Sequence, residues 1–367
     1  MKKFPLFILF YFSLLNAFGQ WLPLSSGMTD YISAASFPAV DTGYAVSQDF
    51  FNGGKIIGTK NGNTWTPQYS TPNYLLTVCF SSSTTGWAGG GIMPDGVIYK
   101  TTNGGQSWSL MEDSIKQVYS LYFVNDNLGW AAANDPTSGN YFIYRSTNGG
   151  ANWQLQKTGL DYIRSAFFIS DSIGWIAGDN GRIFKTTDAG TNWNLLNTGV
   201  VFHFASIYFI DKLKGWAVGA YGNGGVYHSN DGGITWNSQS IPTINMLNSV
   251  YFTSADTGWA CGNNGTILKT NNGGQNWVIQ TSGSTDDFSS ILFSNPAAGY
   301  VFGANGSIRK TTLINGGVTL VKQNENVFYP NPCKDIVHFE LDKNSFNEKE
   351  TRVELYTASG QKLIDEF

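Results

Sequence analysis

The segment SNDGGITW (229–236) consists of turn-forming residues and ends in a tryptophan. The chain carries four near-copies of it, at TTNGGQSW (101–108), STNGGANW (146–153), TTDAGTNW (186–193) and TNNGGQNW (270–277). We expect the Asp or Asn side chain of each copy to accept hydrogen bonds from backbone N–H groups about two residues ahead. The glycine supplies a positive φ angle, and the tryptophan buries a large ring between neighbouring sheets.

The shared pattern, Ser/Thr-x-Asp/Asn-x-Gly-x-Thr/Ser/Asn-Trp, is the Asp-box motif. An isolated carboxylate offers too few ligands for a metal ion, so we assign these residues no catalytic or metal-binding role. The residues interpreted as structural are Asn103, Trp108, Asn148, Trp153, Asp188, Trp193, Asp231, Trp236, Asn272 and Trp277. A shorter copy is TKNGNTW (59–65), and LINGGVTL (313–320) has Leu where Trp belongs.

A longer repeat contains these turns. A Gly followed by Trp or Tyr recurs at Gly43, Gly86, Gly129, Gly174, Gly215, Gly258 and Gly299. The spacing of roughly 42 residues is the length of a four-stranded propeller blade. The 43 glycines and 15% aromatic residues also favour short strands over helices. The sequence therefore predicts an all-β fold, a seven-bladed β-propeller of four-stranded blades over residues 20–313.

The two ends of this repeat complement each other. The segment QWLPLSSG (20–27) is similar to the fourth strand of a blade, NWQLQKTG (152–159). The seventh unit has three strands over residues 288–312 and a degenerate fourth. We therefore predict that Trp21–Leu24 supplies the outer strand of the last blade and closes the ring, which removes an open sheet edge.

The N-terminus has the pattern of a secretory signal. Lys2 and Lys3 precede an apolar run that is short for a membrane span, and Ala17-Phe18-Gly19 provides a cleavage site. We predict that residues 1–19 are a cleaved signal peptide. The mature protein would then have no transmembrane segment and would be secreted or attached to the cell surface after passage through the periplasm.

Composition narrows the possible partners and cofactors. The net charge is −4 and no Lys/Arg-rich block occurs, which argues against nucleic acid as a partner. Three Cys at unrelated positions form no disulfide framework, and Cys79 and Cys261 are expected to be buried. With no Cys-x-x-Cys and three His in the chain, we predict neither a metal nor a cofactor. His228 falls in a column of mostly cationic residues, and we interpret it as part of the scaffold.

The repeat GWACGNNGTILKTNNGGQNW (258–277) resembles the photosystem II stability/assembly factor propellers, a branch of the Asp-box (BNR-like repeat) superfamily. The resemblance covers about residues 28–312 and implies an assembly factor on a propeller fold. Asp-boxes also occur in sialidases, other glycosidases and sorting receptors, so the resemblance leaves the function open.

The C-terminus resembles a different family. NVFYPNPCKDIVHFEL (326–341) and TRVELYTASGQKLID (351–365) are similar to the type A C-terminal sorting domain of the type IX secretion system of Bacteroidetes. The resemblance implies a linker at 314–326 and a partial β-sandwich sorting domain at 327–367, which would engage the secretion machinery. A photosystem role is not expected for such a cell-surface protein.

The templates of known catalytic sites fit poorly. A sialidase needs three converging Arg, and the chain has five Arg, of which Arg352 lies outside the propeller. A glycosidase needs two facing carboxylates roughly 5–10 Å apart. Asp161, Asp286 and Asp287 lie on suitable loops, but spacing alone pairs none of them. The sequence therefore predicts no enzyme, with a secreted glycoside hydrolase of the Asp-box class as one alternative.

A binding face remains. The loops that join the fourth strand to the next first strand, and the second strand to the third, usually line one end of a propeller channel. Here they carry aromatic side chains beside polar groups, which suits an extracellular glycan or protein ligand. We predict a non-catalytic binding or scaffold module, with an assembly factor as the other alternative. The candidate ligand-binding residues are Tyr74, Tyr141, Tyr162, Arg164, His203 and Tyr221.

Overall fold

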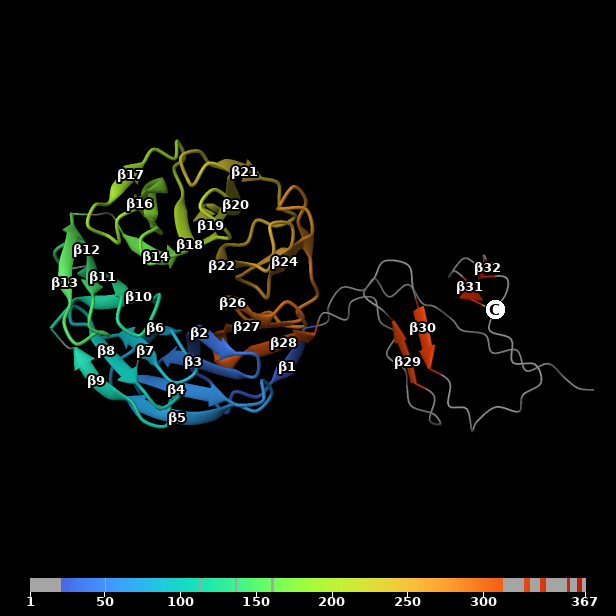
Figure 1. The fold of residues 1–367 in the computed structure, drawn as a ribbon, viewed down its shortest axis with the longest axis horizontal. Coiled ribbons are helices and arrows are strands. Elements are labelled where there is room, and N and C mark those ends of the chain that lie inside the picture. The colour runs from blue at the N-terminus through green and yellow to red at the C-terminus, as the bar shows by residue number, and fades with distance from the viewer. Residues whose placement is uncertain are drawn as a thin grey trace, which may run out of the picture. The chain divides into compact units, whose positions relative to one another are not determined.

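The computed structural model describes residues 21–312 except 50, 113, 136, 160 and 161, together with four short strands beyond residue 326. Residues Gln20–Thr312 form one compact unit. In this unit seven antiparallel four-stranded sheets are arranged in a ring (Figure 1). The predicted all-β, seven-bladed propeller with four-stranded blades is confirmed.

The first three blades follow the chain from the channel outward. Blade 1 comprises β2 (Tyr31–Ala39), β3 (Thr42–Gln48), β4 (Gly54–Thr59) and β5 (Thr66–Thr71). Blade 2 comprises β6 (Leu75–Phe80), β7 (Gly86–Gly90), β8 (Val97–Thr101) and β9 (Ser109–Glu112). Blade 3 comprises β10 (Gln117–Phe123), β11 (Gly129–Asp135), β12 (Asn140–Ser146) and β13 (Gln154–Thr158).

Blades 4 to 6 repeat this order. Blade 4 comprises β14 (Ile163–Phe168), β15 (Gly174–Gly178), the 3-10 turn η1 (Asp179–Gly181), β16 (Ile183–Thr186) and β17 (Asn194–Leu196). Blade 5 comprises β18 (His203–Phe209), β19 (Gly215–Tyr221), β20 (Asn223–Ser229) and β21 (Asn237–Gln239). Blade 6 comprises β22 (Leu247–Phe252), β23 (Gly258–Gly262), β24 (Ile267–Thr270) and β25 (Val278–Ile279).

Blade 7 closes the ring with a strand from the N-terminus. It contains β26 (Phe288–Asn295), β27 (Ala298–Gly303), η2 (Ala304–Gly306) and β28 (Ile308–Thr312), with β1 (Leu22–Leu24) as its outer strand. The strand β1 pairs antiparallel with β28, with Leu22 opposite Lys310 and Leu24 opposite Ile308. The predicted closing strand is confirmed, and Figure 1 shows β1 at the rim beside β28.

The Gly-Trp repeat is explained by packing between blades. Trp175 is fully buried, and its ring stacks on Phe209 of the next blade with centroids 3.7 Å apart. A Cβ at Gly215 would lie 2.4 Å from Phe209, so only glycine leaves room for that ring. The Asp-box Trp236 meets the same Phe209 edge-on at 5.9 Å. All seven blades repeat this ring pair, with centroid distances between 3.6 and 4.4 Å; six pairs are stacked, and Trp259 is tilted by 33° against Phe293.

The residue just before the first Ser or Thr of each Asp-box is cationic in most blades, and it contacts the same buried rings. These residues are Lys100, Arg145, Lys185, His228, Lys269 and Lys310. Lys185 lies 5.1 Å from the Trp175 ring, and Lys269 lies 5.3 Å from the Trp259 ring. His228 occupies the same position in blade 5 and stacks on Trp216 at 4.9 Å. The structure thus agrees with a scaffold role for His228, because it replaces a lysine in a repeated packing contact.

Each Asp-box is a turn that is also tied to the preceding blade. The Ser229 hydroxyl accepts the Gly233 N–H at 2.8 Å, and Asp231 Oδ1 accepts the Thr235 N–H at 2.9 Å. The expectation that the carboxylate reaches about two residues ahead is wrong for this copy, since the bond spans four residues. The Gly232 carbonyl then accepts the indole N–H of Trp175 from blade 4 at 2.9 Å.

The regions outside the propeller are only partly described. The strands β29 (Val327–Pro330) and β30 (Val337–Glu340) form an antiparallel pair, as do β31 (Leu355–Tyr356) and β32 (Lys362–Ile364). The predicted signal peptide 1–19, the copy at 313–320 and the linker 314–326 lie outside the described residues. So does most of the predicted sorting domain at 327–367. In the part of the chain that is described, no helix has the length and hydrophobicity of a membrane span.

Candidate functional site

The two ends of the propeller differ in the loops they carry. The Asp-box turns join the third and fourth strands at one end, which we call the Asp-box face. The loops from fourth to first strand and from second to third strand lie at the opposite ends of the same strands, and we call this end the loop face. The first strands of neighbouring blades contact each other around the channel, so loop-face side chains from adjacent blades can meet.

Five of the six predicted ligand-binding residues gather on blades 3 to 5 of the loop face. We call Tyr141, Tyr162, Arg164, His203 and Tyr221, together with Tyr119 and Asp179, the aromatic cluster. Tyr74 is not among them. It precedes β6 in blade 2, and its carbonyl accepts the Gly91 N–H at 2.9 Å.

Arg164 is at the centre of the cluster because a β-bulge redirects it. The pairing of β14 with β15 shifts between Ile163 and Ser165, which leaves Arg164 as the extra residue of the bulge. Its guanidinium carbon lies 4.6 Å from the Tyr162 ring centroid. Its Nε donates to Asp179 Oδ1 at 2.7 Å, and its Nη2 donates to Oδ2 at 3.4 Å. The guanidinium is thus held by a ring on one side and a carboxylate on the other.

Asp179 joins blades 4 and 5. It begins η1, directly after β15, and its backbone N–H donates to the Tyr162 carbonyl at 2.8 Å. His203, the first residue of β18, places Nδ1 3.0 Å from the same Oδ1 that accepts from Arg164. Asp179 therefore accepts hydrogen bonds from Arg164 of its own blade and lies within ion-pair distance of His203 in the next blade.

The tyrosines extend the cluster to both sides. Tyr162 meets Tyr119 edge-on at 5.4 Å and lies 5.1 Å from Tyr141. Burial, with a further contribution from the hydrogen bond to Tyr119, raises the pKa of Tyr162, so its hydroxyl stays neutral. On the other side, Tyr221 lies 5.5 Å from the His203 ring and is 60% exposed. The cluster thus ends in an aromatic ring that is open to solvent.

Sequence reasoning missed Asp179 and Tyr119. Asp179 follows the second strand of blade 4, where blades 6 and 7 have Asn263 and Ala304. Tyr119 is a bulge residue like Arg164, because the pairing of β10 also shifts between Val118 and Ser120. Both columns vary from blade to blade, with Ala205 at the bulge position of blade 5, so the repeat gives no signal that singles out these two residues.

The pKa shifts resolved for aspartates in the described part of the chain all have one direction. Hydrogen bonds from Thr137 and its neighbours lower the pKa of Asp135, and those from Asn305 and Ser284 lower that of Asp286. Every Asp for which a shift is resolved is shifted downward: Asp49, Asp135, Asp188, Asp211, Asp231 and Asp286. A general acid needs the opposite shift. These carboxylates suit hydrogen bonding and ion pairing.

Neither cysteine of the described chain is activated as a nucleophile. Burial raises the pKa of the Cys79 thiol to about 12 and that of Cys261 as well, which disfavours the thiolate. No three His, Cys, Asp or Glu side chains among the described residues are placed to hold a metal ion. Asp161, one of the loop carboxylates considered above, lies outside the described residues.

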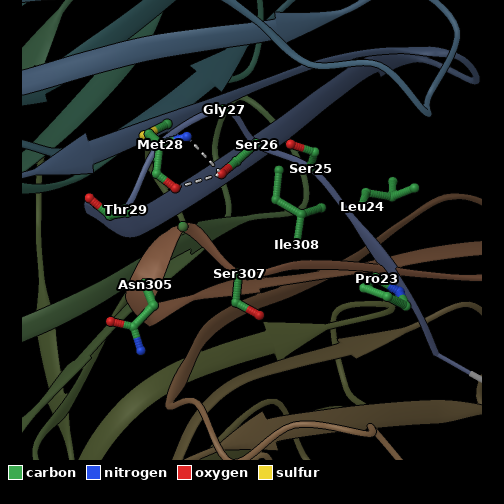
Figure 2. A pocket seen from close by; sticks show the side chains of 11 residues that line it. Pro23, Leu24, Ser25, Ser26, Gly27, Met28, Thr29, Asn305, Ser307 and Ile308 are labelled. Atoms are coloured by element: carbon green, nitrogen blue, oxygen red, sulfur yellow. Dashed lines mark hydrogen bonds between the residues drawn. The ribbon is translucent and has the colours of Figure 1, made fainter.

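A shallow pocket lies where the ring closes, lined by Pro23–Thr29 and Asn305–Ile308 (Figure 2). No ionisable side chain lines it. The Ser26 hydroxyl donates to the Met28 carbonyl at 3.1 Å and accepts the Met28 N–H at 3.3 Å, so its polar group is already engaged. The pocket offers little for recognition, and the aromatic cluster is the better candidate site.

Comparisons with known proteins agree with the propeller fold. Residues 239–312 match the protein-family model described as "Photosynthesis system II assembly factor YCF48". Over 64 residues the chain is 38% identical to the chloroplastic photosystem II stability/assembly factor HCF136 of Oryza sativa subsp. japonica. That match covers 17% of this chain and 15% of the relative.

Solved structures are similar over most of the propeller. A structure described as "YCF48 bound to D1 peptide" has a TM-score of 0.65 at 18% identity and covers 82% of this chain and 99% of that one. YCF48 from Cyanidioschyzon merolae gives a TM-score of 0.66 at 18% identity, with 80% and 99% covered. The GH74 enzyme of Niastella koreensis gives 0.61 at 14% identity, with 80% and 54% covered.

At these identities the likeness to solved structures shows the fold alone, and that fold is shared by assembly factors and a glycoside hydrolase. In sequence, the matched family model covers the last two blades, residues 239–312. The chain is therefore similar to the photosystem II assembly factor YCF48-like BNR propellers, in fold across its seven blades and in sequence over blades 6 and 7.

Proposed function

We propose that this protein is a non-catalytic propeller that binds a segment of a protein partner on its loop face, through the aromatic cluster. The observation that carries the proposal is the bridge from Arg164 through Asp179 to His203, which crosses from blade 4 to blade 5 between tyrosine rings. Tyr and Arg are the side chains most enriched where protein interfaces concentrate their binding energy.

The arrangement suits a polypeptide for physical reasons. The Arg164 side chain is only about one-third exposed, and Asp179 and the Tyr162 ring hold it in place. A side chain that is already ordered loses little conformational entropy on binding. Exposed Tyr221 and the half-buried rings beside it offer apolar area with hydroxyl groups at the edges. Such a surface can pack on side chains and bond to backbone groups of a partner.

The relatives support a partner-binding role. One similar propeller has been solved with a bound peptide, and the curated relative is a stability/assembly factor. Because the carboxyl pKa shifts that are resolved in this chain are downward, a glycoside hydrolase like the GH74 neighbour is a weaker proposal. Secretion, a cell-surface location and sorting by the type IX system remain predictions from the terminal segments.

Photo-crosslinking tests the proposal with a matched pair of positions on blade 5. Tyr221 on the loop face and Ile234 on the Asp-box face are 60% and 59% exposed. Each is replaced in turn by p-benzoylphenylalanine in the full chain, and the native host cells are irradiated. We expect a discrete protein adduct from position 221 and none from position 234. Adducts from position 234 alone, or from neither position, would contradict the proposal.

A binding measurement with the identified partner then locates the contact. We expect Arg164→Ala and Tyr221→Ala each to weaken binding by at least about tenfold, as for residues at the centre of an interface. Ile234→Ala serves as the control and leaves the affinity unchanged. A glycan array gives the competing result: saturable glycan binding that is lost in Tyr162→Ala would replace the protein partner by a carbohydrate.

A further inference from the structure

The loop face carries a second group of exposed side chains, on blades 1 and 2. Phe51, in the loop between β3 and β4, is 96% exposed. Ile92 and Met93, in the loop between β7 and β8, are 48% and 54% exposed. We call these three residues, together with Asp49 and Asp95 of the same two loops, the blade 1–2 knob. None of its members belongs to the aromatic cluster.

Hydrogen bonds fix the backbone of both loops of the knob. In blade 1, Asp49 Oδ1 accepts the N–H groups of Phe51 and Asn52 at 2.7 and 3.0 Å. The backbones of Asp49 and Gly53 also exchange hydrogen bonds of 2.7 and 2.9 Å. Phe51 is therefore presented at the tip of a closed turn, with its ring in water.

The loop of blade 2 is held from two sides. The N–H of Gly91 donates to the Tyr74 carbonyl at 2.9 Å, and the Gln117 side chain donates to the Gly91 carbonyl at 2.7 Å. The Gly96 N–H donates at 2.8 Å to the carbonyl of Ile115, which lies in the loop between β9 and β10.

Both loops pack against the connection between blades 1 and 2: a Cβ at Gly53 would lie 2.2 Å from the Thr71 carbonyl oxygen, and Gly91 is bonded to Tyr74. Large apolar side chains exposed on neighbouring loops are costly in water, and such patches commonly mark interaction surfaces. Tyr74 lies at the base of this knob.

The two carboxylates of the knob indicate the charge of the molecule that would bind there. Among the described residues, no ion pair joins Asp49 or Asp95 to a cation. Nearby acids differ: Asp30 pairs with Lys55 at 2.9 Å and Asp135 pairs with Lys116 at 3.2 Å. The apolar side chains thus share their loops with two carboxylates that are in no ion pair among the described residues. The N–H groups of Phe51 and Asn52, and to a smaller extent the charge of Lys55, lower the pKa of Asp49 and keep it ionised. An anionic membrane surface would be repelled by the same charges.

We propose that the blade 1–2 knob is a second contact surface on the loop face, and that it receives a polypeptide segment in which a large apolar side chain lies next to Lys or Arg. The apolar side chain packs on Phe51 and Met93, while the cation pairs with Asp49 or Asp95. The proposal rests on the proposed function in that the occupant is a protein segment, and it adds the chemistry of that segment.

A positional peptide array tests this with the full-length chain. Its probes are twelve-residue peptides in three sets, which place Phe or Leu beside Arg, Phe or Leu beside Glu, and Ser beside Arg. We expect the chain to retain the apolar–basic set at least about tenfold better than either of the others. Vesicles containing an anionic lipid form the fourth probe, and we expect no binding to them.

The variants separate the knob from the fold. In Asp49→Asn the side-chain oxygen still accepts the two N–H groups that close the turn, so Asp49→Asn combined with Asp95→Asn removes charge alone. We expect this double variant and Phe51→Ser each to abolish the preference for the apolar–basic set. Ile234→Ser, which likewise replaces an exposed apolar side chain by Ser but on the Asp-box face, is the control and keeps the preference.

The outcomes also separate this inference from the proposed function. An unchanged preference in both knob variants, binding to no peptide set, or Phe51-dependent vesicle binding would each overturn the inference. Failure of the proposed function has a different signature, the absence of a crosslink from position 221. If position 221 gives a crosslink and the partner segment binds equally well to the double Asn variant, the proposed function of the aromatic cluster stands and the inference about the knob is wrong.

Discussion

The Asp-box face and the loop face are opposite ends of the same strands, and the blades resemble each other at only one of them. On the Asp-box face, blades 2 to 6 each close their turn with the same two hydrogen bonds, in which a Ser/Thr hydroxyl and an Asp/Asn side-chain oxygen each accept a backbone N–H. On the loop face, the bulge position is Tyr119 in blade 3, Arg164 in blade 4 and Ala205 in blade 5. Positions that pack between blades repeat because each blade must fit its neighbour. Positions facing solvent can diverge, and we place function there.

The loop face is itself divided. On blades 3 to 5 the Asp179 carboxylate is in an ion pair with Arg164 and lies 3.0 Å from His203 Nδ1. On blades 1 and 2 the carboxylates of Asp49 and Asp95 are paired with no cation among the described residues, beside the exposed Phe51 ring. Hydrogen bonds hold the backbone of the second region in place, so the two regions differ in whether their carboxylates form ion pairs.

The largest expected effect is on the packing between blades. Trp175→Ala removes a fully buried ring that stacks on Phe209 and donates to the Gly232 carbonyl. We expect the free energy of unfolding to fall by about 3–5 kcal/mol, the usual cost of truncating a buried aromatic residue. Urea titration followed by tryptophan fluorescence and circular dichroism measures it. A loss below about 1 kcal/mol would show that the stack contributes little.

A smaller effect is expected at the Asp-box turn. Asp231→Ala removes the acceptor for the Thr235 N–H and hydroxyl, as the loss of a helix cap does. We expect the free energy of unfolding to fall by about 1 kcal/mol, with partner binding unchanged. Asp231→Asn is the control, because blades 2, 3 and 6 use Asn at this position with the same geometry. Unchanged stability together with lost binding would contradict the structural role.

We expect acid to lower the stability that the two Asp-boxes containing Asp, those of Asp188 and Asp231, contribute to the fold. Backbone and side-chain hydrogen bonds from Asn192 lower the pKa of Asp188. Burial would raise the pKa of Asp231, but hydrogen bonds from Thr235 and Ser229 outweigh it and lower that pKa as well. A lowered folded-state pKa means that the stabilisation is present above the unfolded pKa of about 4 and is lost as the pH falls through and below it.

The combined Asp188→Asn/Asp231→Asn variant should therefore lose less stability than the natural chain between pH 7 and pH 3. Urea midpoints at the two pH values measure the difference. Equal losses in both proteins would mean that other carboxylates, such as Asp135 with its lowered pKa, account for the acid sensitivity.

The smallest effect on stability is expected on the loop face. Tyr221→Ala truncates a side chain that is 60% exposed and touches the His203 ring. We expect the free energy of unfolding to change by less than about 0.5 kcal/mol, as for most surface substitutions, while partner binding is lost. Measuring both on one preparation sharpens the comparison of the two faces. A variant that is destabilised as strongly as Asp231→Ala would place Tyr221 in the scaffold.

Regular spacing made much of the fold predictable. The Gly-Trp steps gave the number of blades, and the likeness of QWLPLSSG to a fourth strand gave the closing partner of β28. Five candidate residues came together because the strand order alone places their loops at one end of adjacent blades. These features depend on the order of residues along the chain, which a repeat makes visible.

Contacts between blades could not be predicted in the same way. The Trp175 indole bonds to the Asp-box of the next blade, 57 residues away, and Asp179 meets both Arg164 and His203. Tyr74 lies in the same type of loop as Tyr162, between a fourth strand and the next first strand, but two blades away from it. Which side chains meet depends on the bulge that turns Arg164 and on the angle between sheets. Those directions are set when the ring closes, and no spacing in the sequence encodes them.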